Sequence, residues 1–140
     1  MNCNTSKIIT IPISHEHQIQ SALHAALKMA GEMGFSETWA FYVATSVSEL
    51  ASNLIFHATN GGQITMTAVE RPGAIGMELT AEDTGPGIPD LELALQDNFS
   101  TNGGLGSGLP GVNRLMDEFE ITSQPGLGTR VVVRKWKKCR

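Results

Sequence analysis

The sequence lacks several features that would each point to a particular class of protein. It has only two cysteines, Cys3 and Cys139, one near each end. A structural disulfide between them is one interpretation, but the low count favours the reduced thiols of a cytosolic protein. No apolar run approaches the roughly 18 residues that a membrane span needs, and the N-terminus has no signal-peptide pattern. We therefore expect a soluble cytoplasmic protein that does not insert into a membrane.

The sequence also has no strong excess of positive or negative charge. The formal net charge is −4, which gives no global reason to expect nucleic-acid binding. Six of the ten Lys and Arg residues lie between residues 130 and 140. We interpret this basic end as a solvated edge strand and tail, with docking of an acidic partner as the alternative. The 140 residues, without internal repeats, fit a single domain over residues 1–140.

Glycine, by contrast, is frequent, and the periodicity of apolar residues predicts several short elements. Fifteen glycines without a repeat period indicate tight turns or a ligand site lined by backbone. Helical spacing begins after Ser14, a candidate cap, and ends at Gly34, and Ser36 is the candidate cap of a second helix. The predicted helices cover residues 15–33, 37–57, 90–96 and 111–118, and the predicted strands cover 7–13, 63–70, 75–83, 120–123 and 129–135.

The order of these elements predicts the fold class. Strands and helices do not alternate strictly, so a doubly wound parallel sheet is not expected. An α/β (α+β) sandwich of two layers fits better, with the helices on one face of a mixed, mostly antiparallel sheet. The longest segment without a strong pattern, residues 84–111, is Gly-rich, as in a loop that contacts a ligand.

The first motif that suggests chemistry lies on the second predicted helix. Glu49 and Asn53 are four residues apart, so they share one helix face. An asparagine offers Mg²⁺ a neutral oxygen ligand, and a carboxylate beside it can accept a proton from an attacking hydroxyl or water. The alternative is an ordinary solvated helix face, because the E-x-x-x-N pattern is short and common.

The second motif is the segment that starts at Asp83 and contains Gly85 and Gly87. An acid at the end of a strand can accept a hydrogen bond from an exocyclic amine such as that of adenine, and the glycines let backbone approach a flat ring. The alternative is a turn in which the aspartate only caps the backbone.

The third motif is a Gly-rich segment, residues 102–109, that leads into a predicted helix. Its glycines expose backbone N–H groups, and a helix N-terminus favours anions, so together they can wrap a triphosphate. The pattern matches neither a P-loop nor a Rossmann turn, and the alternative is a flexible linker. The candidate phosphate-binding residues are Gly104, Leu105, Gly106, Ser107, Gly108 and Leu109.

Each motif is modest alone, but their order along the chain is distinctive. A helical Glu/Asn pair, then D-x-G-x-G, then G-x-G-x-G, then Gly128-Thr129 resembles the nucleotide site of the GHKL superfamily. That superfamily includes histidine kinases, gyrase-type ATPases, Hsp90, MutL and the anti-sigma-factor kinases. The resemblance covers roughly residues 36–136 and implies a Bergerat-type sandwich that binds ATP with Mg²⁺.

Further details point to one branch of the superfamily. Many histidine kinases have a lysine where this chain has Phe56, whereas Asn53 followed by His57 is similar to the anti-sigma-factor kinases. Residues 97–119 resemble the RsbT-type switch kinases of bacterial stress signalling, with Asn98 as a departure from the glycine common there. This resemblance implies a kinase that phosphorylates Ser or Thr on a small STAS-domain protein. It also implies that the released kinase activates a downstream PP2C-type phosphatase or another signalling effector.

The same resemblance implies a role for each candidate residue. Glu49 would be the general base and Asn53 the Mg²⁺ ligand, while Asp83 would read the adenine amine with Gly87 and Thr129. The glycines of the third motif would donate to the phosphates. Two alternatives remain open, an anti-sigma factor with kinase activity and a non-catalytic binding module gated by ATP. Neither a nucleic-acid nor a membrane partner is expected.

Overall fold

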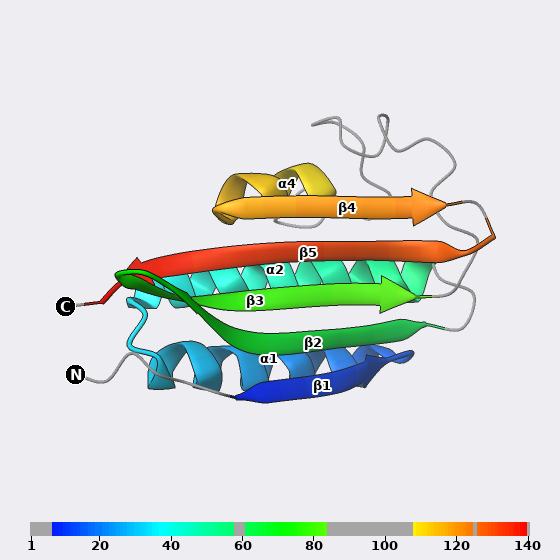
Figure 1. Cartoon of the computed structure of the whole chain (residues 1–140). Coiled ribbons are helices and arrows are strands. Elements are labelled where there is room, and N and C mark those ends of the chain that lie inside the picture. Colours follow the sequence, from blue (N-terminus) through cyan, green and yellow to red (C-terminus); the bar gives the residue numbers. More distant parts are fainter. Residues whose placement is uncertain (1–6, 58–60, 84–107, 125, 140) are drawn as a thin grey trace.

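The computed structural model describes residues 7–57, 61–83, 108–124 and 126–139, which form two layers (Figure 1). One layer is a five-stranded sheet of β1 (Ile8–Ile13), β2 (Gly62–Arg71), β3 (Ala74–Asp83), β4 (Glu118–Gln124) and β5 (Gly128–Lys138). The strand order is β1-β2-β3-β5-β4, and every described pairing is antiparallel. The predicted two-layer sandwich is confirmed, although the described strands include no parallel pair where a mixed sheet was expected.

The second layer consists, in the described ranges, of three helices that cover one face of the sheet. They are α1 (Glu16–Glu32), α2 (Glu37–His57) and α4 (Leu109–Leu115). The middle helix, α2, packs against both α1 and α4 and lies behind β3 and β5 (Figure 1). Its buried residues recur at helical spacing, so α2 is the centre of the hydrophobic core. These residues are Val43, Val47, Leu50, Ala51 and Leu54.

The starts of the two long helices show one correct and one wrong prediction. The Ser36 hydroxyl accepts a hydrogen bond from the Trp39 N–H at 3.2 Å, which confirms the predicted cap of α2. The cap expected at Ser14 is wrong, because α1 begins one residue later, after His15. There Gln18 Oε1 accepts hydrogen bonds from the N–H groups of Ser14 at 2.6 Å and His15 at 2.9 Å. The longer glutamine side chain reaches back over the first turn and satisfies these donors itself.

The basic strand β5 is an interior strand, so the predicted solvated edge is wrong. It pairs with β3 on one side and with β4 on the other. Successive residues point to opposite faces of the sheet, which places Val131 and Val133 in the core, and Arg130 and Arg134, with Val132 between them, on the other face. Arg134 lies between three glutamates there, with Nε 2.8 Å from Glu78, and Nη1 2.9 Å from Glu118 and 3.5 Å from Glu120. These glutamates neutralise the basic segment, so it can lie inside the sheet. The charge count of the sequence does not predict where these acids lie.

Three further expectations can be compared with the structure. Cys139 is disulfide-bonded, so the expectation of reduced thiols is wrong for this residue. Its N–H donates to the Gly73 carbonyl of the β2–β3 turn at 2.9 Å, so the C-terminal strand is also tied to that hairpin. The helix predicted at residues 90–96 lies outside the described residues. Among the helices that the structure describes, none is long and apolar enough to cross a membrane.

Candidate active site

The carboxylate of Glu49 lies on the central helix in an environment unlike a solvated surface. Its exposure is only 5%, although it is a charged residue. Charged side chains are almost never so buried unless they are paired. Asn53, one helical turn later, is partly exposed. The burial of Glu49 argues against the interpretation of this helix face as an ordinary solvated one. The spacing of four residues places the carboxylate and the amide one above the other on α2.

Asp83 ends β3 at the same end of the molecule as the C-terminal half of α2 (Figure 1). It pairs with Gly62 at the start of β2. A Cβ at Gly62 would lie 2.2 Å from the Glu82 carbonyl oxygen, 2.8 Å from Leu54 Cδ2 and 3.1 Å from Asp83 Cβ. No side chain fits there, so Gly62 lets α2 approach the end of β3.

Gly62 is therefore a site residue that the sequence interpretation missed. The pair Gly61-Gly62 predicts a turn, and Gly61 does have a positive φ of 70°. The sequence does contain a signal for the close approach at Gly62. One glycine is enough for such a turn, so the second glycine indicates another steric requirement. Its function is to bring the helix with Glu49 and Asn53 against the strand that ends in Asp83.

Thr129 lies at the beginning of β5, which runs beside β3 in the sheet (Figure 1). The residues next to both candidates pair directly, Glu82 with Arg130, so Asp83 and Thr129 lie at the same end of neighbouring strands. The Thr129 and Ser123 hydroxyl oxygens are 2.9 Å apart and share a hydrogen bond across the β4–β5 hairpin. Ser123 is a second residue that the motif search missed, and it orients the threonine hydroxyl.

The last described candidates are Gly108 and Leu109, where α4 begins. Gly108 has φ 71° and ψ −148°, a conformation that L-residues with a side chain rarely adopt. Leu109 is buried at 6% exposure, so its side chain belongs to the core and only its backbone could face a ligand. α4 starts here and not at residue 111, because Pro110 is well tolerated in the first turn of a helix.

The described residues include four of the candidate side chains, with Asp83 and Thr129 at the same end of neighbouring strands and Glu49 and Asn53 in the C-terminal half of α2. Glu49 and Asn53 come from α2, Asp83 from β3 and Thr129 from β5. The remaining candidates lie outside the described residues. They are Gly85, Gly87, Gly104, Leu105, Gly106 and Ser107.

Comparisons with known proteins agree with this arrangement. The family described as "Histidine kinase-, DNA gyrase B-, and HSP90-like ATPase" matches residues 42–138. A serine/threonine-protein kinase RsbT of Bacillus subtilis is 44% identical over 126 residues, which are 90% of this chain and 94% of that protein. An anti-sigma F factor of Caldanaerobacter subterraneus is 37% identical over 99 residues, 67% of this chain and 68% of that protein.

A solved structure extends the comparison to the fold. The RsbU and RsbW domains of Rv1364c from Mycobacterium tuberculosis align over 98% of this chain and 34% of that chain, with a TM-score of 0.63 at 15% identity. At this identity the similarity concerns the fold alone. The family match covers β3, β5 and α2 from residue 42 onward, the three elements that hold these four side chains. The chain therefore belongs to the family of histidine kinase-, DNA gyrase B- and HSP90-like ATPases, as its three motifs predicted.

Proposed function

We propose that this chain is an ATP-dependent serine/threonine protein kinase. The observation that carries the proposal is the buried Glu49 carboxylate, one turn before Asn53 on the central helix and beside a groove that reaches the surface. A protein that only binds ATP has no need of a proton acceptor there. The 44% identity to a protein named as a serine/threonine kinase, over 94% of its length, supports the same activity.

The nucleotide would be held by groups from both layers. The Asp83 carboxylate would accept a hydrogen bond from the adenine amine, with Gly85 and Gly87 giving backbone access to the ring. Thr129, oriented by Ser123, would contribute through a water molecule. Backbone N–H groups of the Gly-rich segment would donate to the phosphates. These phosphate-binding residues are Gly104, Leu105, Gly106, Ser107, Gly108 and Leu109.

Asn53 would ligate Mg²⁺. Asn53 is partly exposed, and its amide oxygen suits a hard cation that takes most other ligands from phosphate and water. Bound Mg²⁺ would neutralise charge on the phosphates during transfer. Glu49 would accept the proton of the acceptor hydroxyl while that oxygen bonds to the γ-phosphorus. The bond from this phosphorus to the β–γ bridging oxygen breaks in the same step, and ADP leaves.

The substrate in this proposal is Ser or Thr on a small STAS-domain protein in the cytoplasm. The released kinase would then bind and activate a downstream PP2C-type phosphatase or another signalling effector. A second candidate function is that of an anti-sigma factor with kinase activity, favoured by the 37% identity to an anti-sigma F factor. Binding of a sigma factor and of a STAS-domain protein, compared by pull-down, separates the two. A non-catalytic ATP-gated module is the third candidate.

The first experiment measures transfer of labelled phosphate from ATP to STAS-domain proteins encoded beside this gene. We expect transfer to Ser or Thr with the wild type. With Glu49→Gln we expect a loss of about 10²–10⁴-fold, because general bases typically contribute that much. ATP affinity of the variant, measured by calorimetry, should stay within about threefold. ATP binding without transfer to any STAS-domain protein would refute the kinase and favour the ATP-gated module.

A further inference from the structure

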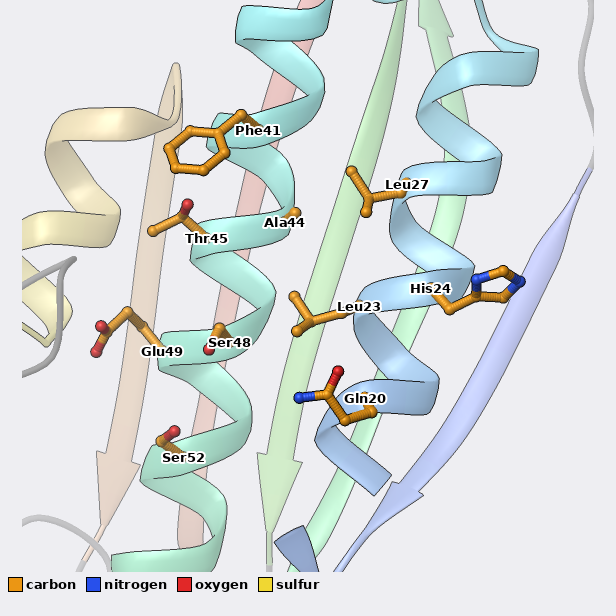
Figure 2. Close-up of a pocket in the computed structure, with 10 residues that line it drawn as sticks. All are labelled: Gln20, Leu23, His24, Leu27, Phe41, Ala44, Thr45, Ser48, Glu49 and Ser52. Carbon is orange, nitrogen blue, oxygen red and sulfur yellow. The ribbon is translucent and has the colours of Figure 1, made fainter. Parts of the chain in front are cut away.

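A surface groove of about 620 Å³ runs along the outer side of the helical layer (Figure 2). Side chains of α1 and α2 line it, on the side of these helices away from the sheet. We call it the α1–α2 groove. Phe41 of α2 and Leu27 of α1 line one part, and Glu49 lines another. Figure 2 shows the Glu49 carboxylate pointing away from α1. The candidate base is thus one boundary of the groove.

The groove changes character along α2. At the end nearest the start of α2, its large side chains are apolar and exposed, with Phe41 at 58% and Leu27 at 47%. Toward the C-terminal end of α2 the residues that α2 contributes become polar, with Thr45, Ser48, Glu49 and Ser52, while α1 contributes Leu23 and Gln20 opposite them (Figure 2). An apolar region and a polar region that contains the candidate base therefore lie in one continuous depression (Figure 2).

Two of the exposed apolar side chains, Phe41 and Leu27, share this groove. The exposure of Phe41 and Leu27 leaves apolar surface in contact with water, and burial of that surface would be favourable. Aromatic side chains beside a polar rim are typical of contacts with another polypeptide. A ligand that only needed the carboxylate would make no use of an apolar region two helical turns away.

The spacing of the two regions limits what can occupy both. Phe41 and Glu49 are eight residues apart on one helix, which corresponds to about 12 Å along its axis. An extended polypeptide advances about 3.3 Å per residue, so about four of its residues span this distance. Residues four apart in an extended segment also point to the same side.

We propose that the α1–α2 groove receives an extended segment of the substrate protein, with an apolar side chain between Phe41 and Leu27 and the acceptor Ser or Thr at Glu49. The apolar residue lies about four positions from the acceptor. The groove thereby selects which hydroxyl is phosphorylated. This inference rests on the proposed kinase function and adds a specificity determinant to it.

The test uses the full chain and a STAS-domain protein that it phosphorylates in the first experiment. Phe41→Ser and Leu27→Ser remove apolar side chains from the groove, and Ile8→Ser is the matched control. Ile8 is 67% exposed and lies on β1, where the alternation of burial places it away from the helices. We expect KM for the protein substrate to rise at least about tenfold in the double groove variant, the loss of about 1.4 kcal/mol of binding. Its kcat and ATP affinity, and all constants of Ile8→Ser, should change less than twofold.

A second measurement checks the spacing. A photo-reactive phenylalanine analogue at position 41 should crosslink to the substrate about four residues from the phosphorylated Ser or Thr, and the same analogue at position 8 should not. Unchanged KM in the groove variants, or a crosslink far from the acceptor, overturns the proposal while the kinase function stands. If Phe41→Ser instead converts a dimer to a monomer in sedimentation, a second copy fills the groove and the proposal is wrong. If the wild type binds ATP and transfers no phosphate, the proposed function and this inference both fail.

Discussion

At the scale of single residues, two neighbouring positions of the site, Asp83 and Gly62, have different roles. Asp83 and Gly62 face each other across β2 and β3, and Leu54 of α2 packs on the glycine. The aspartate supplies the chemistry, whereas the glycine supplies the space that brings α2 to it. The two positions therefore predict different consequences of substitution, one in ligand affinity and one in folding.

Substitution of Asp83 by Asn should reduce affinity for ATP without unfolding the protein. A hydrogen bond to a charged acceptor contributes about 1.5–3 kcal/mol, so the dissociation constant should rise about 10- to 100-fold. Calorimetric titration with ATP measures this change, with Glu70→Gln as an exposed acid on β2 for control. Affinity equal to that of the wild type would refute the adenine role of Asp83.

Substitution of Gly62 by Ala should destabilise the fold. The added methyl group would meet the Glu82 carbonyl oxygen at 2.2 Å, so backbone or helix must shift at a cost of about 1–3 kcal/mol. Gly31 in α1 is the matched control, because a Cβ there meets nothing within 4 Å. Gly31→Ala should stabilise the helix by about 0.5–1 kcal/mol. Urea unfolding measures both, and similar effects at the two positions would contradict the steric argument.

At the scale of elements, a buried lysine connects the end of α4 to the sheet through hydrogen bonds. Lys135 of β5 is 7% exposed, and its Nζ donates to the Leu115 carbonyl at 3.1 Å and to Asp117 Oδ1 at 3.3 Å. The same ammonium lies 5.1 Å from the centre of the Trp39 ring and 5.3 Å from that of Tyr42. The lysine thus joins the end of α4, the start of β4 and the N-terminal part of α2.

Substitution of Lys135 by Met should test this junction. The methionine keeps much of the apolar stem but removes the donor to the Leu115 carbonyl and to Asp117 Oδ1, which should cost about 1–3 kcal/mol. Asp117 Oδ2 still accepts from the Trp136 N–H at 2.8 Å. The exposed Lys138 on the same strand is the control, and Lys138→Met should change stability by less than about 0.5 kcal/mol. Thermal unfolding followed by circular dichroism compares the two. An equal effect of both variants would show that the contacts of Lys135 do not stabilise the fold.

At the scale of the whole molecule, the face of the sheet opposite the helices carries a charged network. Glu118 accepts a hydrogen bond from Trp136 Nε1 at 2.7 Å and pairs with Arg134 and Arg71. The Trp136 ring packs over Gly76, where a Cβ would lie 2.7 Å from it, and Arg71 lies 4.1 Å from the ring centre. The hydrogen bond from Trp136, followed by the bond and charge of Arg134, lowers the pKa of Glu118 below its ordinary 4.5.

This lowered pKa predicts a dependence of stability on pH. Because the carboxyl of Glu118 is more acidic in the folded protein than in the unfolded chain, the ionised form stabilises the fold above about pH 4.5. That stabilisation is lost as the pH falls through the lower, folded pKa. Glu118→Gln should therefore reduce the free energy of unfolding at pH 7, by up to about 1 kcal/mol for so exposed a pair. The difference from the wild type should shrink toward pH 3 in urea titrations, and a difference that grows instead would contradict the sign.

Much of the fold and the site could be predicted from local sequence. The alternation in residues 7–13 and the helical spacing after residue 36 depend only on neighbours along the chain, so β1 and α2 were predicted within a residue. Glu49 and Asn53 share a helix face for the same local reason. The order of the three motifs was enough to indicate the family, because the backbone of a nucleotide site needs glycines and acids at fixed places.

Tertiary structure alone decided the features that depend on residues distant in sequence. The neighbours of β5 made it an interior strand, since Glu78 and Glu118 come from two other strands to meet Arg134. The need for a glycine at position 62 depends on Leu54, which packs against it from α2. The burial of Glu49 depends on the packing of α2 within the helical layer. The α1–α2 groove exists because two helices separated by a turn lie side by side with Phe41 and Leu27 exposed. The sequence by itself determined the local elements and the chemistry, whereas packing between distant segments decided what lies next to that chemistry.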